Sequence, residues 1–123
     1  MRKLILLLPL LIMFGCAAHV QHPGTANAFD SSTFDTLLVT HNTIEQTKSA
    51  LAAGSFPVAI AGNVKTALNA LIKVYDDADT AYLAYHAAAM AGTATPAQSS
   101  AVTAGLSNVS SATTNLTNAK GAK

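Results

Sequence analysis

Residues 55–91 decide the fold: SFPVAIAGNVKTALNALIKVYDDADTAYLAYHAAAMA. Side chains suited to a core recur there at spacings of three and four, which places them on one face of an α-helix. They are Ala61, Val64, Leu68, Leu71, Tyr75, Ala78, Tyr82, Tyr85 and Ala89. Pro57 is tolerated in the first turn of a helix, and Ser55 is a suitable N-cap. We therefore expect a long helix over about residues 57–91, with a start at Asn63 as the alternative, since Gly62 weakens a helix.

A second helix is expected before it, over about residues 32–53. Ser32 and Asp35 can cap its start, and Gly54 can end it. The side chains expected to form its inner face are Phe34, Leu37, Leu38, His41, Ile44, Lys48 and Leu51.

A third helix is expected over about residues 96–119. Thr95, Pro96 and Gln98 form a capping-box pattern at its start. Its inner face would hold Val102, Leu106, Val109, Thr113 and Leu116. The segment is rich in Ser, Thr and Asn, which favour caps over helix interiors, so it needs the long helix to pack against.

Short connections between these segments imply antiparallel neighbours. The sequence thus predicts an all-α protein, a small up-down-up three-helix bundle with a long central helix. The helical domain would occupy residues 31–123. Residues 16–30 would be a flexible tether, in which His19 and His22 are solvated.

The first residues, MRKLILLLPLLIMFGC, have the layout of a secretory signal peptide. Arg2 and Lys3 precede an apolar run that is too short to span a bilayer. The chain's single cysteine, Cys16, follows directly.

The segment MFGC, residues 13–16, resembles the lipobox of bacterial lipoproteins. That resemblance implies removal of residues 1–15 by cleavage between Gly15 and Cys16, and attachment of diacylglycerol to Cys16, with a further acyl chain such as palmitate on its amino group. It also implies a lipid-anchored protein of the cell envelope. Ala17 at the following position, rather than Asp, favours the outer membrane facing the periplasm in an organism that has one.

Charge limits the possible partners of the mature chain. Cleavage would remove two of the seven basic residues, and the remaining five face six acids, for a net charge of −1. Nucleic-acid binding requires a clustered positive surface, so we expect none. A C-terminal Lys123 resembles the end of the peptidoglycan-linked major lipoprotein of enteric bacteria. However, Gly54, Pro57, Gly92 and Pro96 interrupt this chain, and we expect no covalent wall link.

The stretch 73–89, KVYDDADTAYLAYHAAA, holds the candidate site residues. A ligand or partner face could form from His41, Tyr75, Asp79, Tyr82, Tyr85 and His86. The alternative is a row of core tyrosines with solvated carboxylates, because aromatic residues at helical spacing are usually core. No catalytic motif is present, so we expect no enzyme, no metal and no cofactor besides the lipid on Cys16.

Three functions remain open at this stage. The first is a lipid-anchored, non-catalytic structural or protein-interaction module of the envelope, including self-association. The second is a small periplasmic binding protein that holds an apolar ligand or a cation between its helices. The third is a lysis or exclusion lipoprotein of a phage or plasmid.

Overall fold

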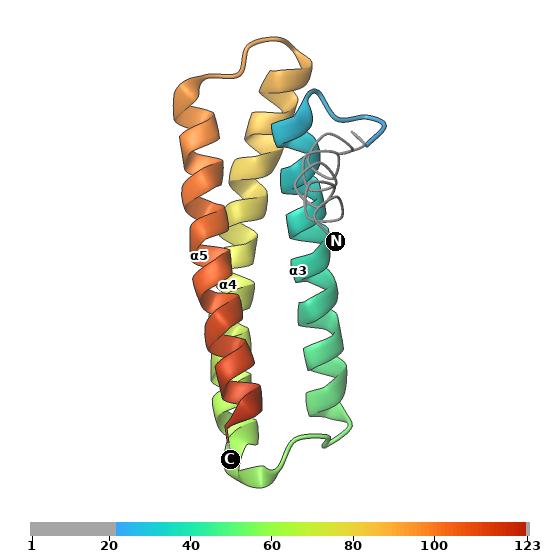
Figure 1. The fold of residues 1–123 in the computed structure, drawn as a ribbon, viewed down its shortest axis with the longest axis vertical. Helices are drawn as coiled ribbons and strands as arrows, with labels where there is room; N and C mark the ends of the chain where they lie inside the picture. The colour runs from blue at the N-terminus through green and yellow to red at the C-terminus, as the bar shows by residue number, and fades with distance from the viewer. Residues whose placement is uncertain (1–21, 123) are drawn as a thin grey trace, which may run out of the picture.

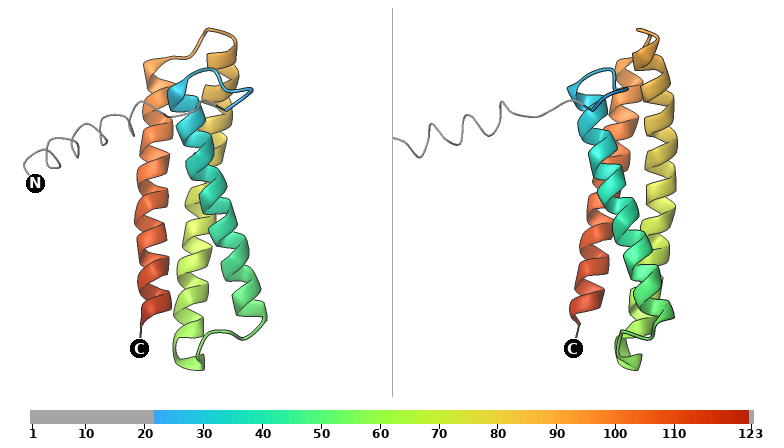
Figure 2. Two further views of the ribbon diagram at one scale, coloured as in Figure 1. Left: turned by 45° about the vertical axis from the view of Figure 1, so that its right-hand side comes forward. Right: turned by 90° about the vertical axis from the view of Figure 1, so that its right-hand side faces the viewer.

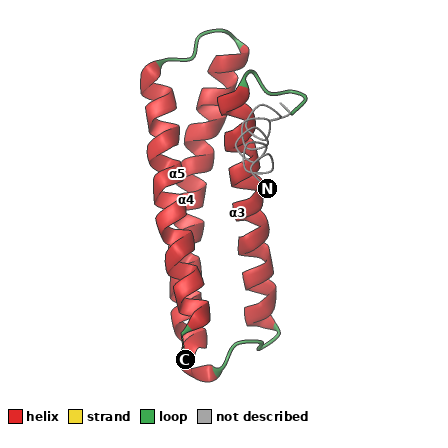
Figure 3. Cartoon of the chain, in the orientation of Figure 1, coloured by secondary structure: helices red, strands yellow, loops and turns green. Residues whose placement is uncertain are grey.

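The protein is a bundle of three antiparallel helices, as expected from the sequence (Figure 1). The structure, a computed structural model, describes residues 22–122. Helix α3 spans Ala28–Ala52, α4 spans Val58–Met90 and α5 spans Pro96–Gly121. Figure 3 shows that the rest of the described chain consists of loops, at the two ends of the bundle and before α3. The fold class and the long central helix are confirmed.

Both connections between helices are closed by glycines in the left-handed region. Gly54 has φ of 68° and Gly92 has φ of 72°. After α3, the Gly54 N–H donates to the Leu51 carbonyl and the Ser55 N–H to the Ala50 carbonyl, which is a Schellman motif. Gly92 ends α4 in the same way. The two glycines thus stop the helices where the sequence predicted.

The start of α5 also agrees with the prediction. The Thr95 hydroxyl accepts from the Gln98 N–H, and the Gln98 side chain accepts from the Thr95 N–H, which completes the capping box.

The start of helix α4 differs from the expected one. It begins at Val58 without a side-chain cap and runs through Gly62, so Ser55 is not its N-cap and Asn63 is not its start.

Helix α3 begins earlier than expected. Asn27 is its N-cap, and the Asn27 side chain accepts from the Asp30 N–H at 2.9 Å. Ser32 lies inside the helix and donates to the Phe29 carbonyl. The boundary at residue 31 is therefore wrong, because residues 28–30 form the first turn of α3. The expected tether residues 16–21 lie outside the described part of the chain.

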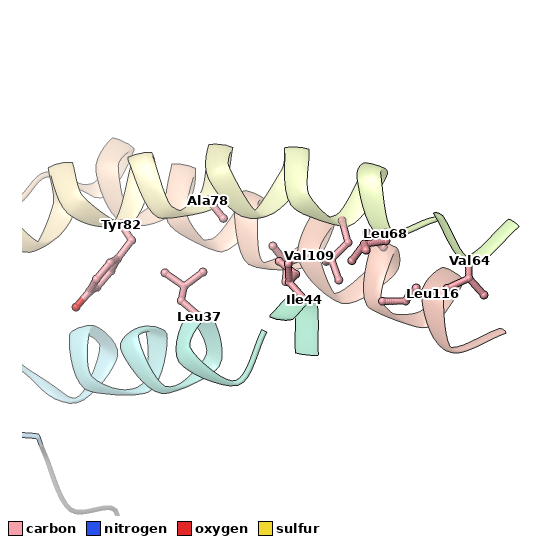
Figure 4. Packing of buried hydrophobic residues seen from close by; sticks show 10 residues of the cluster. Leu37, Ile44, Val64, Leu68, Ala78, Tyr82, Val109 and Leu116 are labelled. Atoms are coloured by element: carbon pink, nitrogen blue, oxygen red, sulfur yellow. The ribbon is translucent and has the colours of Figure 1, made fainter. Parts of the chain in front are cut away.

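The core lies between α4 and both neighbouring helices (Figure 4). Its buried members are Leu37, Ile44, Val64, Leu68, Leu71, Ala78, Tyr82, Val109, Ala112 and Leu116. Helix α5 lies very close to α4, since a Cβ built on Gly105 would sit 3.0 Å from the Cα and Cβ of Ala78. The expected support of α5 by α4 is thus present.

Helix α3 leans across the other two helices, as the turned views in Figure 2 show. Its buried face is rotated relative to the expected one. Leu37 and Ile44 are buried, but they share that face with Thr33, Thr40 and Thr47, whereas the expected Phe34, Leu38, His41 and Lys48 are exposed. The hydroxyls of Thr40 and Thr47 donate to carbonyls four residues earlier in the helix, which makes their burial tolerable.

Candidate functional site

A buried polar cluster joins the start of α3 to the end of α4. Its centre is Asp30, whose side chain is fully buried. One carboxylate oxygen of Asp30, Oδ2, accepts from the Ala26 N–H at 2.7 Å and lies 2.8 Å from Nδ1 of His86. The position of Asp30 in the first turn of α3 also suits a negative charge. The cluster therefore ties two segments that lie far apart in the sequence.

Tyr85 extends this cluster toward the N-cap of α3. The Asn27 amide donates to the Tyr85 hydroxyl at 3.1 Å, while its carbonyl oxygen caps the helix. The rings of Phe29 and Tyr85 pack edge to face with centroids 5.1 Å apart. Asn27 thus fixes the entry of α3 and the side chain of Tyr85 together.

Tyr82 lies one turn below His86, in the core. Figure 4 shows its side chain extending from α4 toward α3. Its ring is 5.7 Å from that of His86. Burial, followed by the negative charge of Asp30, raises the pKa of Tyr82 to about 12. The neutral phenol is therefore the form that this environment holds.

The remaining candidate residues form a separate group further along the bundle. The rings of His41 and Tyr75 are 6.0 Å apart, and burial followed by the charge of Asp79 raises the pKa of Tyr75. His41, Tyr75 and Asp79 line a hollow of about 310 Å³ between α3 and α4. Tyr82 lines the same hollow. The six candidate residues thus divide between this open hollow and the buried cluster around Asp30, to which Tyr85 and His86 belong.

Sequence reasoning missed the partners that organise the buried cluster. Asp30 and Asn27 fell in the expected tether, although the pair three residues apart has the spacing of an N-cap and its first-turn acid. His22 was expected to be solvated, but its side chain contacts the Asp35 carboxylate and its ring packs on Phe34 at 5.5 Å. Its backbone N–H also donates to the Ser31 hydroxyl. The segment from His22 onward is therefore held against α3.

Large apolar side chains are exposed beside the open hollow. Phe34 is 40%, Leu38 46% and Leu83 56% exposed, and all three line it. They come from two helices and lie on the same side of the bundle, so they form one surface rather than scattered exposures. We call Phe34, Leu38 and Leu83 the apolar cluster.

Several expected features concern residues outside the described range, namely Gly15, Cys16 and Lys123. Within residues 22–122, no three His, Cys, Asp or Glu side chains are grouped closely enough to hold a metal ion. None of the described helices combines the length and the apolar character needed to cross a bilayer.

Comparisons with known proteins found no protein family, no curated protein and no solved structure that matches this chain.

Proposed function

We propose that this chain is a lipid-anchored protein of the bacterial cell envelope, and that its bundle is a non-catalytic module that binds another protein. The observation that carries the binding role is the apolar cluster on α3 and α4. Exposed apolar side chains grouped on one surface are typical of interaction sites. The lipobox resemblance at Cys16 supports the anchor.

The position of the apolar cluster fits such an anchor. Five residues of chain lie between Cys16 and His22, and the six steps from Cys16 to His22 can span at most about 20 Å. The contact between His22 and Phe34 then ties the end of this segment to the apolar cluster. A lipid on Cys16 would keep this end of the bundle near the membrane, with Lys120 and the end of α5 at the far end (Figure 1).

The anchor is tested by the substitution Cys16→Ser, with Ala18→Ser as the matched control. Because only a cysteine thiol can take the diacylglycerol, Cys16→Ser should accumulate as an unprocessed precursor. The control should be cleaved and lipidated. Intact-mass spectrometry of the membrane fraction distinguishes the two forms. Normal cleavage of Cys16→Ser at residue 16 would refute the lipidation, whatever the bundle binds.

A second candidate function is the binding of a small apolar molecule. The hollow lined by His41, Tyr75, Asp79 and Tyr82 favours it, since a volume of about 310 Å³ is at the lower end of known ligand sites. Addition of envelope phospholipid to the detergent-solubilised full chain should then raise its melting temperature. Leu38→Asp should abolish that increase, while an unchanged melting temperature in the parent protein would remove this candidate.

A further inference from the structure

A row of adjoining hollows, which we call the groove, follows the α3–α4 side of the bundle. It consists of three hollows of about 310, 160 and 540 Å³. The first and second share His41 and Tyr75 in their walls, and the second and third share Lys48 and Ile72. The groove therefore extends from the apolar cluster at one end of the bundle to Ala52 and Ala61 at the other.

The residues along the two edges of this groove repeat every three or four positions. On α3 they are Phe34, Leu38, His41, Glu45, Lys48 and Ala52. On α4 they are Gly62, Lys65, Asn69, Ile72, Asp76, Asp79 and Leu83. Alternation of three and four is the spacing with which helices pack side by side in bundles and coiled coils. Each helix thus carries a second packing face besides the one that is buried in the core.

The chemistry of the edges changes in a fixed order along the groove. The end nearest the start of α3 is apolar, the middle is acidic, and the far end is basic. Phe34, Leu38 and Leu83 form the apolar zone. The acidic zone consists of Asp79, which lines the same hollow as the apolar cluster, and of Glu45 and Asp76 in the middle hollow. The basic zone consists of Lys48, which lines both the middle and the far hollow, and Lys65 in the far hollow. Lys48 pairs with Glu45 at 2.8 Å, whereas Lys65 has no ion pair among the described residues. The middle and far zones therefore leave Asp76, Asp79 and Lys65 available to a partner.

This order of charges argues against a second copy of the chain as the occupant. In a parallel pair, acidic zones face acidic zones and lysines face lysines. In an antiparallel pair, the acidic middle zones still face each other, and the lysines of each copy face the apolar cluster of the other. Like charges placed opposite each other across an interface cost several kcal/mol, so self-pairing is disfavoured in both orientations.

We propose that the groove seats one amphipathic helix of a different protein, which completes a four-helix bundle. The proposal rests on the proposed function and specifies its partner. The segment of α3 from Phe34 to Ala52 is about 27 Å long, so the partner helix needs roughly five turns. Along this length it should present apolar residues to the apolar cluster, Lys or Arg to the acidic zone, and Asp or Glu near Lys65. Apolar contact supplies affinity, and the order of charges sets the direction and register of the helix.

Site-specific photo-crosslinking in living cells tests this proposal on the full chain. The crosslinking residue replaces Leu38, Asn69 or Leu83 in the groove, and Asn108 on the exposed side of α5 as the control. All four positions are exposed, so the substitutions should leave the core intact. We expect the three groove positions to give adducts with the same partner, on one helical segment with the stated order of charges, and Asn108 to give none.

Charge reversal on one edge gives an independent test. In the chain that carries the crosslinker at Asn69, Lys65→Glu should lower the adduct yield by about fivefold or more, because an acidic partner residue would face a like charge. Lys73→Glu makes the same charge change outside the groove, where Lys73 pairs with Asp77, and should leave the yield within about twofold. Equal losses in both variants would overturn the assignment.

The outcomes separate the groove from the general function. An adduct to one partner through Asn108 and not through the groove would overturn this inference but leave a protein-interaction module in place. Adducts of the groove positions to a second copy, or to lipid alone, would overturn the choice of occupant. The absence of any intermolecular adduct at all four positions would contradict both the groove assignment and the interaction role.

Discussion

Asp30 is the residue on which the end of the bundle at the start of α3 depends most. A fully buried carboxylate is tolerated only when its oxygens have partners, and here the Ala26 N–H and His86 supply them. The contact at its centre joins Asp30 to His86, which lies 56 positions later in the chain. Tyr82, Tyr85 and His86 could be found in the sequence from their helical spacing. Asp30 could not be paired with them, because that contact depends on how α3 is placed against α4.

Replacement of Asp30 by Asn should destabilise the fold. The amide carries no charge and places an N–H donor where Oδ1 stood, 3.0 Å from Nδ1 of His86, so the buried interaction between the two side chains is weakened. We expect a loss of about 1–3 kcal/mol in the free energy of unfolding. Asp77→Asn, at an exposed pair with Lys73, should cost less than about 0.5 kcal/mol. Urea denaturation followed by circular dichroism measures both, and equal effects would contradict the role of Asp30.

Tyr82 should ionise only at unusually high pH. Its pKa is raised to about 12 from an ordinary value of 10.0, so the fold favours its protonated form. The resulting stabilisation is complete below pH 10 and is lost as the pH rises toward 12. Ultraviolet titration of phenolate should show a late step that Tyr82→Phe removes, and unfolding should coincide with that step in the parent protein. A Tyr82→Phe variant with an unchanged late step would refute this assignment.

Thr33 is a buried residue whose hydroxyl is not hydrogen-bonded in the described structure. Its hydroxyl oxygen has no hydrogen-bond partner there, whereas the equally buried Thr47 donates to the Thr43 carbonyl. An unpaired buried hydroxyl is unfavourable, and valine has almost the same shape. We therefore expect Thr33→Val to raise the free energy of unfolding by about 1 kcal/mol more than Thr47→Val does. An equal or smaller gain, measured by denaturant unfolding, would show that the Thr33 hydroxyl has a partner after all.

At the scale of the elements, the C-terminal ends of α3 and α4 and the start of α5 were predictable, whereas the start and the inner face of α3 were not. Gly54, Gly92 and the capping box of Thr95 act through local geometry, so the sequence alone could reveal them. The inner face of α3 could not be predicted in this way. Its apolar side chains Phe34 and Leu38 fit the helical period as well as the threonines do, and only tertiary packing selects the threonine side for burial.

The contact between α4 and α5 depends on Gly105. A methyl group there would meet the backbone of Ala78 at 3.0 Å, so Gly105→Ala should force the helices apart. Overpacking of this kind costs about 1–3 kcal/mol. Replacing Gly by Ala in a helix gains about 1 kcal/mol of helix propensity, so the cost of overpacking should outweigh that gain. At Gly62 a Cβ would meet nothing within 4 Å, and Gly62→Ala should stabilise the protein. Thermal unfolding of the two variants should shift in opposite directions, and a stabilised Gly105→Ala would contradict the close approach.

At the scale of the whole molecule, most acidic side chains lie toward the end of the bundle where α3 starts, although Lys48 and Lys73 pair with acids between the two ends. Asp30 and Asp35 lie near the start of α3, Asp76, Asp77 and Asp79 lie past the middle of α4, and Lys120 lies in the last turn of α5 at the opposite end. Net charge and composition could not reveal this order, since it appears only when the antiparallel helices are placed side by side. It gives the groove between α3 and α4 a direction.

We propose that lipidation at Cys16 presents the α3–α4 groove to an envelope partner. The most direct test is the photo-crosslink at Leu38, measured in the parent chain and in Cys16→Ser at equal expression. Leu38 is exposed in the apolar cluster, so a crosslinking residue there reports contacts with other molecules. We predict one intermolecular protein adduct in the parent chain and its loss, by about tenfold or more, in Cys16→Ser, because the uncleaved precursor lacks the lipid that would hold the groove at the membrane of its partner. An adduct of equal yield in both would contradict presentation by the anchor, and no adduct in either would contradict the groove as a binding site.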